Sequence, residues 1–202
     1  RWMASALYHE EFGYYSRGVR DIGRRGDFST WPRRDASLGR AIARWLREDA
    51  SGLREDASRL RAGGRHTPII EAGAGTGELA REVLRGLGIF RRRRFLIAEV
   101  SPALRAVQKN LLGRRAEWFD GLGAALEAAG GSADIYANEL ADAFPCRVFR
   151  AEAGSWSELS VGISDGRPVE IWEPARDLPD SSALEAGWPD GQRVEVHESL
   201  RR

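Results

Sequence analysis

Apolar residues between positions 68 and 137 follow two different spacings. Short, largely apolar runs bounded by helical or turn segments are typical of buried strands, and they occur at 68–72, 95–100, 116–119 and 133–137. Between these runs apolar residues recur every three or four positions, which predicts helices over 76–87, 102–112 and 122–129. Because strands and helices alternate, the pattern predicts a parallel α/β sheet with right-handed crossovers.

The chain before this region differs in composition. Residues 1–34 are rich in glycine, aromatic residues and arginine, which predicts loop with short strands or turns rather than helix. From Asp35 the apolar spacing becomes helical, and a seven-residue repeat places leucine at Leu46, Leu53 and Leu60. A coiled coil needs a longer apolar stripe, so we interpret this repeat as a helix that packs on its own domain.

Beyond Pro145 the pattern changes again, and three antiparallel strands are predicted, at 147–151, 156–163 and 168–172. The pattern from Val194 onward predicts the start of another helix. Because four strands are an unusual end for such a sheet, we expect the domain to be C-terminally truncated. We divide the chain into an N-terminal cap and helix over 1–64 and a partial sheet domain over 65–202, with a β-hairpin insertion at about 147–173.

The clearest chemical signal lies between the first predicted strand and its helix, where Glu71 is followed by Gly73, Gly75 and Gly77. Alternate glycines allow a tight turn and let the backbone approach a ligand closely. The helix N-terminus behind them offers free N–H groups and a partial positive charge. Glu99 ends the second predicted strand, where a carboxylate can accept both hydroxyls of an adenosine ribose. We therefore predict a cofactor site here, with a turn that serves packing alone as the alternative.

The glycine spacing distinguishes between cofactors. The dinucleotide fingerprint is Gly-x-Gly-x-x-Gly, whereas this loop has Gly-x-Gly-x-Gly after an acid. The loop resembles the first motif of class I S-adenosylmethionine-dependent methyltransferases. Further motifs in the same order resemble the MidA-like family, namely Tyr8-His9, Gly13-Tyr14-Tyr15, 26–32, Leu38-Gly39, 99–108, 138–145 and Trp156-Ser157-Glu158. Arg33 departs from the family, which usually has glutamate at that position.

The resemblance implies a Rossmann-like class I methyltransferase fold with S-adenosyl-L-methionine as the cofactor. The family includes the mitochondrial complex I assembly factor that methylates arginine, so it implies a protein substrate, with a respiratory complex I subunit as one candidate. The cofactor-binding residues that we expect are Glu71, Gly73, Gly75, Gly77, Glu99, Asp120 and Asn138. Asp120 lies equally well in an ordinary turn, and Asn138 equally well caps a short helix.

A cationic guanidinium acceptor needs carboxylates that bind it and hold its plane. Glu139 and Asp142 are three residues apart and share one face if their segment is helical, and Asp27 is a third candidate. We expect these three acids to act in catalysis. The alternatives are a helix-terminal acid for Glu139 and a surface charge for Asp142.

Composition excludes several other classes of function. The 31 basic and 30 acidic residues give a net charge of +1, so no strong field attracts nucleic acid or a membrane surface. The four arginines at 91–94 are interpreted as a solvated loop. No apolar run in the sequence approaches the roughly 18–20 residues of a membrane helix. Cys146 is the single cysteine, and it forms no ligand spacing with His9, His66 or His197, so we expect no metal.

A bacterial cytoplasmic location follows as the expectation, with a mitochondrial location as the alternative. Three rival functions stay open at this point. One is the same fold acting on another acceptor, another is an inactive binding or assembly module, and the third is a dinucleotide enzyme. Binding of S-adenosyl ligands in preference to dinucleotides excludes the third, and turnover of an acceptor excludes the second.

Overall fold

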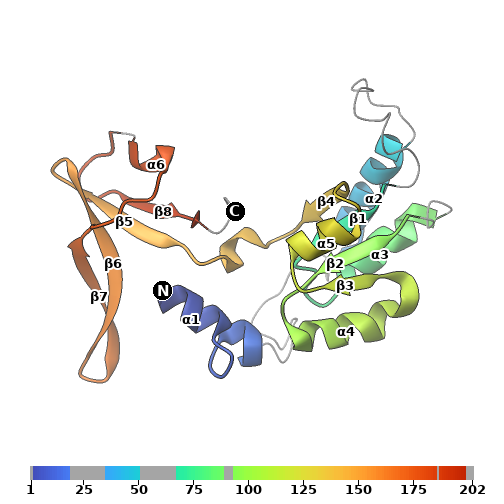
Figure 1. Cartoon of the computed structure of the whole chain (residues 1–202), viewed down its shortest axis with the longest axis horizontal. Helices are drawn as coiled ribbons and strands as arrows, with labels where there is room; N and C mark the ends of the chain where they lie inside the picture. The colour runs from blue at the N-terminus through green and yellow to red at the C-terminus, as the bar shows by residue number, and fades with distance from the viewer. Residues whose placement is uncertain (1, 19–34, 51–66, 89–92, 186, 199–202) are drawn as a thin grey trace. The chain divides into compact units, whose positions relative to one another are not determined.

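The computed structural model describes residues 2–18, 35–50, 67–88, 93–185 and 187–198, and Figure 1 shows the ribbon. These residues form two compact units. One unit is Tyr15–Leu140, which we call the sheet unit, and the other joins Arg1–Tyr14 to Ala141–Arg202, which we call the antiparallel unit. The domain boundary expected at residue 64, the leucines at 53 and 60, and Asp27 lie outside the described residues.

The sheet unit contains four parallel strands at the positions that the apolar runs predict. They are β1 (Ile69–Ala72), β2 (Phe95–Ala98), β3 (Glu117–Phe119) and β4 (Asp134–Ala137). Their order is β3-β2-β1-β4, and Ile69 lies opposite both Phe95 and Asp134. This is the order in which a doubly wound sheet begins, so the α/β prediction is confirmed.

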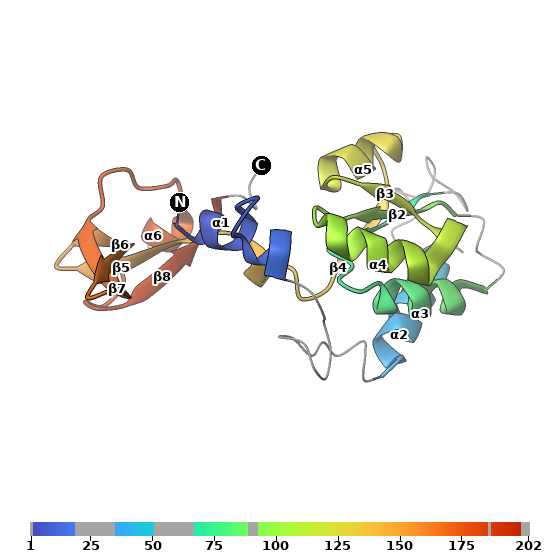
Figure 2. The ribbon, with the colours of Figure 1, turned by 90° about the horizontal axis from the view of Figure 1, so that it is seen from below.

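Helices cover both faces of this sheet. They are α2 (Ser37–Ala50), α3 (Glu78–Leu87), α4 (Pro102–Leu112) and α5 (Leu122–Ala128), with a 3-10 turn, η5, at Gly113–Arg115. Ile69 and Ile97 share a buried cluster with Leu46 of α2 and with side chains of α3, whereas Ile70 and Leu96 pack with α5. Figure 2 shows α5 on one side of the strands and α3 and α4 on the other. Because both faces are covered, β1 and β2 are buried along their whole length.

The antiparallel unit is a sheet of the order β7-β6-β5-β8. Its strands are β5 (Arg147–Glu152), β6 (Ser155–Ser164), β7 (Arg167–Pro174) and β8 (Arg193–Val196), and its short helices are α1 (Trp2–Tyr8), η6 (Ala141–Ala143) and α6 (Ser182–Glu185). The three strands expected between 147 and 172 are confirmed. A π-helical turn, η1 (Tyr14–Gly18), spans the boundary between the two units.

Two expectations for this part of the chain are wrong. Residues 193–196 form a strand, where a helix was expected from Val194, because exposed and buried residues alternate there and the segment pairs with β5. Residues 2–8 form α1, where loop was expected. Glycine and proline are absent from α1, and the first glycine of the chain is Gly13, so the breakers that suggested loop act only after the helix.

The four arginines at 91–94 were expected to be solvated, and for Arg93 this is wrong. Arg93 is 6% exposed, and its guanidinium donates to the carbonyl oxygens of Thr67 (2.6 Å) and Leu46 (3.1 Å) and pairs with Asp134. Arg94 pairs with Glu117 on β3 (2.7 Å). These two arginines therefore join elements of the sheet unit. Among the described residues, no helix has the length and apolarity needed to span a membrane.

Candidate functional site

The loop after β1 has the backbone geometry that its glycines permit. Gly73, Gly75 and Gly77 have φ angles of 68°, 54° and 82°, a region that side chains disfavour. The N–H of Gly73 donates to the carbonyl oxygen of Ala98 (2.9 Å), and the N–H of Gly77 donates to that of Ala74 (2.8 Å). Gly77 precedes α3 and offers no side-chain cap. The first N–H groups of α3 therefore lie beside a loop that presents backbone to a ligand.

Gln108 of α4 connects this loop to the end of β2. Its side chain is fully buried, and its Nε2 donates both to the carbonyl oxygen of Gly75 (2.8 Å) and to Oε2 of Glu99 (3.1 Å). Its Oε1 accepts a hydrogen bond from the indole N–H of Trp118 (3.0 Å). Gln108 is part of the family motif identified at 99–108, but sequence reasoning gave it no role. The available signal was a polar residue four positions from Leu104 and from Leu112, on the apolar face of its helix.

Glu99 is 6% exposed at the carboxyl end of β2. Its Oε1 accepts a hydrogen bond from the backbone N–H of Ser101 (2.9 Å). Burial raises the pKa of Glu99, and the N–H donors of Ser101 and Gln108 oppose that rise. Ser101 also caps α4, as expected, and its hydroxyl donates to the carbonyl oxygen of Tyr15 (3.1 Å). Tyr15, the last residue of the Gly-Tyr-Tyr motif, is thereby held next to the start of α4.

Glu71 lies within β1 and is 2% exposed. Its Oε2 accepts a hydrogen bond from the hydroxyl of Tyr136 on β4 (3.0 Å), its neighbour in the strand register. Burial raises the pKa of Glu71 to about 8, and the nearby charge of Glu99 adds to the rise while the Tyr136 hydroxyl opposes it. Two acids with raised pKa values thus lie in the sheet unit, at and next to the glycine loop, which is typical of functional sites.

The loop after β4 approaches the glycine loop. A Cβ placed on Gly73 would lie 2.5 Å from Cδ1 of Leu140, so only glycine leaves room for this side chain. Glu139, next to Leu140, is exposed and has a φ of 50°, which is uncommon for a residue other than glycine. Backbone strain of this kind is often found at functional sites. Asn138, which precedes it, is half-buried.

The expectation that a helix starts at Asn138 or Glu139 is wrong. The 3-10 turn η6 begins only at Ala141, and Glu139 has left-handed backbone geometry. The shared helix face expected for Glu139 and Asp142 is therefore absent. Asp142 is exposed and belongs to the antiparallel unit, whereas Glu139 belongs to the sheet unit. Asp120 is exposed and pairs with Arg105, whose Nε donates to the carbonyl oxygen of Glu99 (2.6 Å).

Comparisons with known proteins agree with this geometry. The family model for putative S-adenosyl-L-methionine-dependent methyltransferases matches residues 41–202. The mitochondrial protein arginine methyltransferase NDUFAF7 homolog of Drosophila melanogaster is 28% identical over 196 residues, which cover 82% of this chain and 41% of the fly protein.

Two solved structures from Burkholderia thailandensis are also similar. One, described as a likely methyl transferase, is bound to S-adenosyl-homocysteine. It has 28% identity and a TM-score of 0.74 over 98% of this chain and 51% of its own. The other, an uncharacterized protein of the same superfamily, has 29% identity and a TM-score of 0.66 over 98% of this chain and 50% of its own. The class I methyltransferase fold and the resemblance to MidA-like proteins are thereby confirmed. The chain spans about half the length of these solved relatives.

Proposed function

Since this chain belongs to the family of putative S-adenosyl-L-methionine-dependent methyltransferases, we propose that it binds S-adenosyl-L-methionine and methylates a protein arginine side chain. The observation that carries the proposal is the connection of the glycine loop to Glu99 through the buried side chain of Gln108. A fixed distance between loop and carboxylate is what a cofactor with a methionine part and a ribose requires.

In this proposal the ribose hydroxyls bind Glu99. A carboxylate has about four acceptor sites, so the N–H donors of Ser101 and Gln108 leave acceptor capacity for a ribose. The methionine part lies along Gly73, Gly75 and Gly77, with Glu71 and Asn138 beside it, and the adenine extends toward Asp120. The S-adenosyl-homocysteine bound to the Burkholderia relative supports this choice of ligand.

The electrostatics favour this cofactor over a dinucleotide. Glu71 and Glu99 lie close enough for the charge of one to raise the pKa of the other. A pyrophosphate beside two buried carboxyl groups would add negative charge where it is already unfavourable. The sulfonium and ammonium groups of S-adenosylmethionine bring positive charge to the same place. The glycine spacing, which lacks the dinucleotide fingerprint, supports the same assignment.

The proposed acceptor is an arginine guanidinium held by Glu139, with Asp142 and Asp27 as further candidate acids. A lone pair of the guanidinium nitrogen forms a bond to the methyl carbon while the carbon–sulfur bond breaks and leaves S-adenosylhomocysteine. The nitrogen then loses a proton to a carboxylate or to water. The protein's part is alignment of the acceptor, because the methyl group is already activated in the sulfonium.

The protein arginine methyltransferase named among the relatives supports arginine as the acceptor. A respiratory complex I subunit stays a candidate substrate. The bacterial cytoplasm stays the proposed location, with the mitochondrion as the alternative because the fly relative is mitochondrial.

Calorimetry and methyl transfer test the proposal together. We expect the full chain to bind S-adenosylhomocysteine and not NAD, and to transfer labelled methyl groups to arginine-containing peptides but not to their lysine-substituted counterparts. Label on a different residue contradicts the arginine acceptor and leaves the cofactor assignment standing. Cofactor binding without transfer to any acceptor favours an inactive binding module, and binding of NAD alone contradicts the cofactor assignment.

A further inference from the structure

A second group of reactive side chains lies in the antiparallel unit and is independent of the glycine loop. The sulfur of Cys146, a carboxylate oxygen of Glu195 and an imidazole nitrogen of His197 all lie within 4.8 Å of one another. Cys146 and His197 are half-buried, and Glu195 is exposed. Thiolate, imidazole and carboxylate are the three side-chain groups that bind zinc in proteins.

The strand register explains why these residues meet. In the antiparallel pair of β5 and β8, Arg147 lies opposite Val196. Continuing that register by one residue places Cys146 opposite His197, just beyond the paired ends. Glu195 lies two residues before His197 and therefore shares its face of the strand. The buried Val194 and Val196 take the other face and pack with Phe149. The positions of these three residues are thus set by the backbone pairing of β5 and β8.

The imidazole of His197 adds an independent observation. Its Nδ1 is buried and has no hydrogen-bond partner among the described residues. Its Nε2 lies 3.9 Å from a carboxylate oxygen of Glu195, which is beyond hydrogen-bond distance. A buried polar nitrogen without a partner is unfavourable. A metal ion between these groups would bind Nε2, the nitrogen that faces Glu195, and Nδ1 would then carry the proton of the neutral ring.

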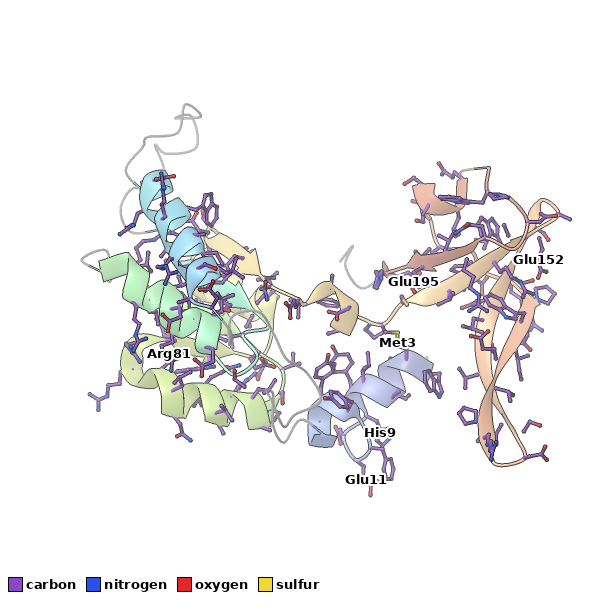
Figure 3. All side chains as sticks on the ribbon, turned by 180° about the vertical axis from the view of Figure 1, so that it is seen from behind. Met3, His9, Glu11, Arg81, Glu152 and Glu195 are labelled. Carbon is purple, nitrogen blue, oxygen red and sulfur yellow. The ribbon has the colours of Figure 1, made fainter. Side chains whose placement is uncertain are left out.

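The thioether of Met3 covers the sulfur of Cys146. The backbone N–H of Cys146 lies 3.4 Å from the Met3 sulfur, and the Cys146 thiol lies 3.7 Å from it. Figure 3 labels Met3 on α1 and Glu195 on β8. A thioether is a weak zinc ligand and a soft, apolar neighbour for a sulfur atom. Met3 therefore shields the thiol from water on one side.

From this geometry we propose that Cys146, Glu195 and His197 bind a zinc ion. Ligand atoms of tetrahedral zinc are about 3.3–3.8 Å apart, given bond lengths of about 2.0–2.3 Å, so the donor atoms need to approach one another by at most about 1.5 Å. The fourth position of the ion is left to water. The bound zinc joins the segment before β5 to the end of β8.

The sequence analysis expected no metal, and the spacing of these three residues along the chain explains why. A sequence pattern detects ligands that lie a few residues apart, as in zinc fingers. Here Cys146 precedes β5, and the other two ligands lie at the end of β8, which pairs with β5 after a long connection. Only strand pairing brings them together.

Titration of the untagged full chain tests this site. We expect one zinc ion per chain in competition with a chromophoric chelator, and a thiolate-to-metal charge-transfer band when cobalt(II) replaces zinc. Because even indirect partners of a metal contribute 10- to 100-fold to affinity, we expect Cys146→Ser to lower zinc affinity by at least about 100-fold and to abolish the cobalt band. His197→Gln should lower zinc affinity comparably while a weaker cobalt band persists.

The matched control is His9→Asn, because His9 is exposed and its Nδ1 accepts the backbone N–H groups of Glu11 (3.1 Å) and Phe12 (3.3 Å). We expect this variant to bind zinc like the unmodified chain. Equal zinc affinity of the unmodified chain and both ligand variants overturns the site, as does loss of affinity in His9→Asn. Far-ultraviolet circular dichroism of each variant shows whether it is folded. The melting temperature provides a second readout, because zinc should raise it only in the unmodified chain and in His9→Asn.

Discussion

Two buried acids of the sheet unit and two acids of the antiparallel unit have pKa values shifted in opposite directions. In the sheet unit, Glu71 and Glu99 are buried and have pKa values raised by burial. In the antiparallel unit, Glu152 and Glu158 have pKa values lowered by hydrogen bonds, from Ser157 and Arg150 to Glu152 and from Arg147 to Glu158. Acids that already have a cation are used by the fold itself. The buried acids that form no ion pair with an arginine among the described residues are therefore the better candidates for a ligand.

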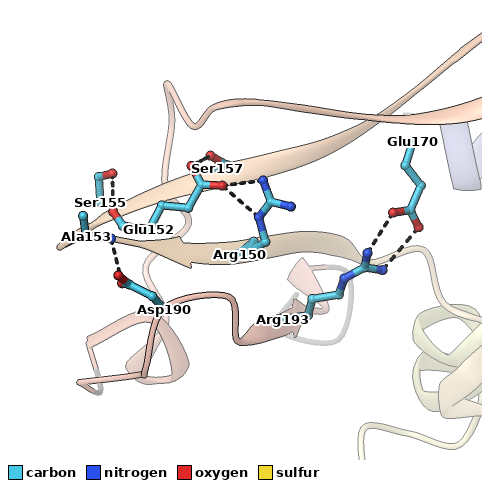
Figure 4. A network of polar contacts seen from close by, with 8 residues as sticks. All are labelled: Arg150, Glu152, Ala153, Ser155, Ser157, Glu170, Asp190 and Arg193. Carbon is cyan, nitrogen blue, oxygen red and sulfur yellow. Dashed lines mark hydrogen bonds and ion pairs between the residues drawn. The ribbon is translucent and has the colours of Figure 1, made fainter.

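The difference follows from how each unit is stabilised. The sheet unit buries β1 and β2 under helices on both faces, and Glu71 and Glu99 lie within β1 and at the end of β2. The antiparallel unit leaves β7 almost wholly exposed and has a small buried core around Phe149. Its strands are joined by polar contacts, as Figure 4 shows for Arg193 of β8 with Glu170 of β7 (2.8 Å) and for Ser157 of β6 with Glu152 of β5 (2.5 Å). Arg150 and Arg193 also lie over the ring of Trp172, 4.3 and 5.0 Å from its centre.

The largest expected effect comes from a pair of glycines with the same backbone angle, one in each unit. Gly77 and Gly154 both have a φ of 82°. Valine at either position costs about 1–3 kcal/mol of backbone strain. At Gly77 the new side chain also lies against Gln108, whose Cγ would lie 3.4 Å from the added Cβ, and the loop loses its contacts to the cofactor. We expect Gly77→Val to weaken S-adenosylhomocysteine binding by about 1000-fold or more, measured by calorimetry.

Gly154→Val is the control, because a Cβ there meets no atom within 4 Å and the residue lies in the turn between β5 and β6. It should reduce stability and leave cofactor affinity unchanged. Equal affinities of the two variants would place the cofactor away from the glycine loop.

The next effect concerns the acceptor. We expect Glu139→Gln to keep cofactor affinity and to slow methyl transfer by about 30- to 1000-fold, because the loss of one charged contact to an aligned acceptor costs about 2–4 kcal/mol. Turnover and cofactor binding are measured in the same preparation. Asp165→Asn is the matched control, since Asp165 has a φ of 49° in the turn between β6 and β7. A joint fall of turnover and binding in Glu139→Gln would identify Glu139 as a structural or cofactor residue.

A smaller effect tests the ribose contact. We expect Glu99→Ala to weaken cofactor binding by about 1.5–3 kcal/mol, or about 10- to 150-fold, which is the scale of hydrogen bonds to a charged group. Glu158→Ala removes an acid that Arg147 already binds (2.7 Å), and it should leave cofactor affinity unchanged. Calorimetric affinities that are the same for both variants would contradict the division between ligand-binding and structural acids.

The apolar spacing was sufficient to predict most elements of both units. Within the runs at 68–72 and 95–100, β1 and β2 are buried on both faces, and the strands between 147 and 172 have a recognisable turn, so local pattern and tertiary structure agree there. The segment at 193–196 was misassigned because four residues are too few to distinguish a strand from a helix by periodicity, and pairing with β5 decides its structure.

For the candidate site, spacing identified the glycine loop and Glu99 but not what connects them. Gln108 is far from Gly75 in sequence, and its role depends on how α4 packs on the sheet. Glu139 could be named from its motif, but its backbone angle depends on how the loop after β4 packs around Leu140 and Gly73. The burial of Arg93 among strands and α2 likewise depends on tertiary contacts that a run of arginines does not reveal.

The smallest effect concerns the pH dependence of stability. The pKa of Glu71 is about 8 in the folded chain, against its ordinary value of 4.5. Between these two values the native state binds more protons than the unfolded state, so stability falls as pH rises, by up to about 1.4 kcal/mol per pH unit. Glutamine cannot ionise, so we expect the free energy of unfolding of Glu71→Gln in urea to depend less on pH between 6 and 8 than that of the unmodified chain.

Glu158 serves as the control, because its pKa is shifted in the opposite direction to that of Glu71. Its pKa is lowered by the hydrogen bond from Arg147, so its contribution is fully present above the ordinary pKa of a glutamate and is lost only as pH falls further. Glu158→Gln should thus change stability by the same amount at pH 6 and at pH 8, and its curve should run parallel to that of the unmodified chain. If Glu71→Gln also runs parallel over this range, Glu71 is ionised throughout and the contrast between the two units rests on Glu99 alone. If its curve flattens, the sheet unit holds a proton on Glu71 that a cationic ligand can displace.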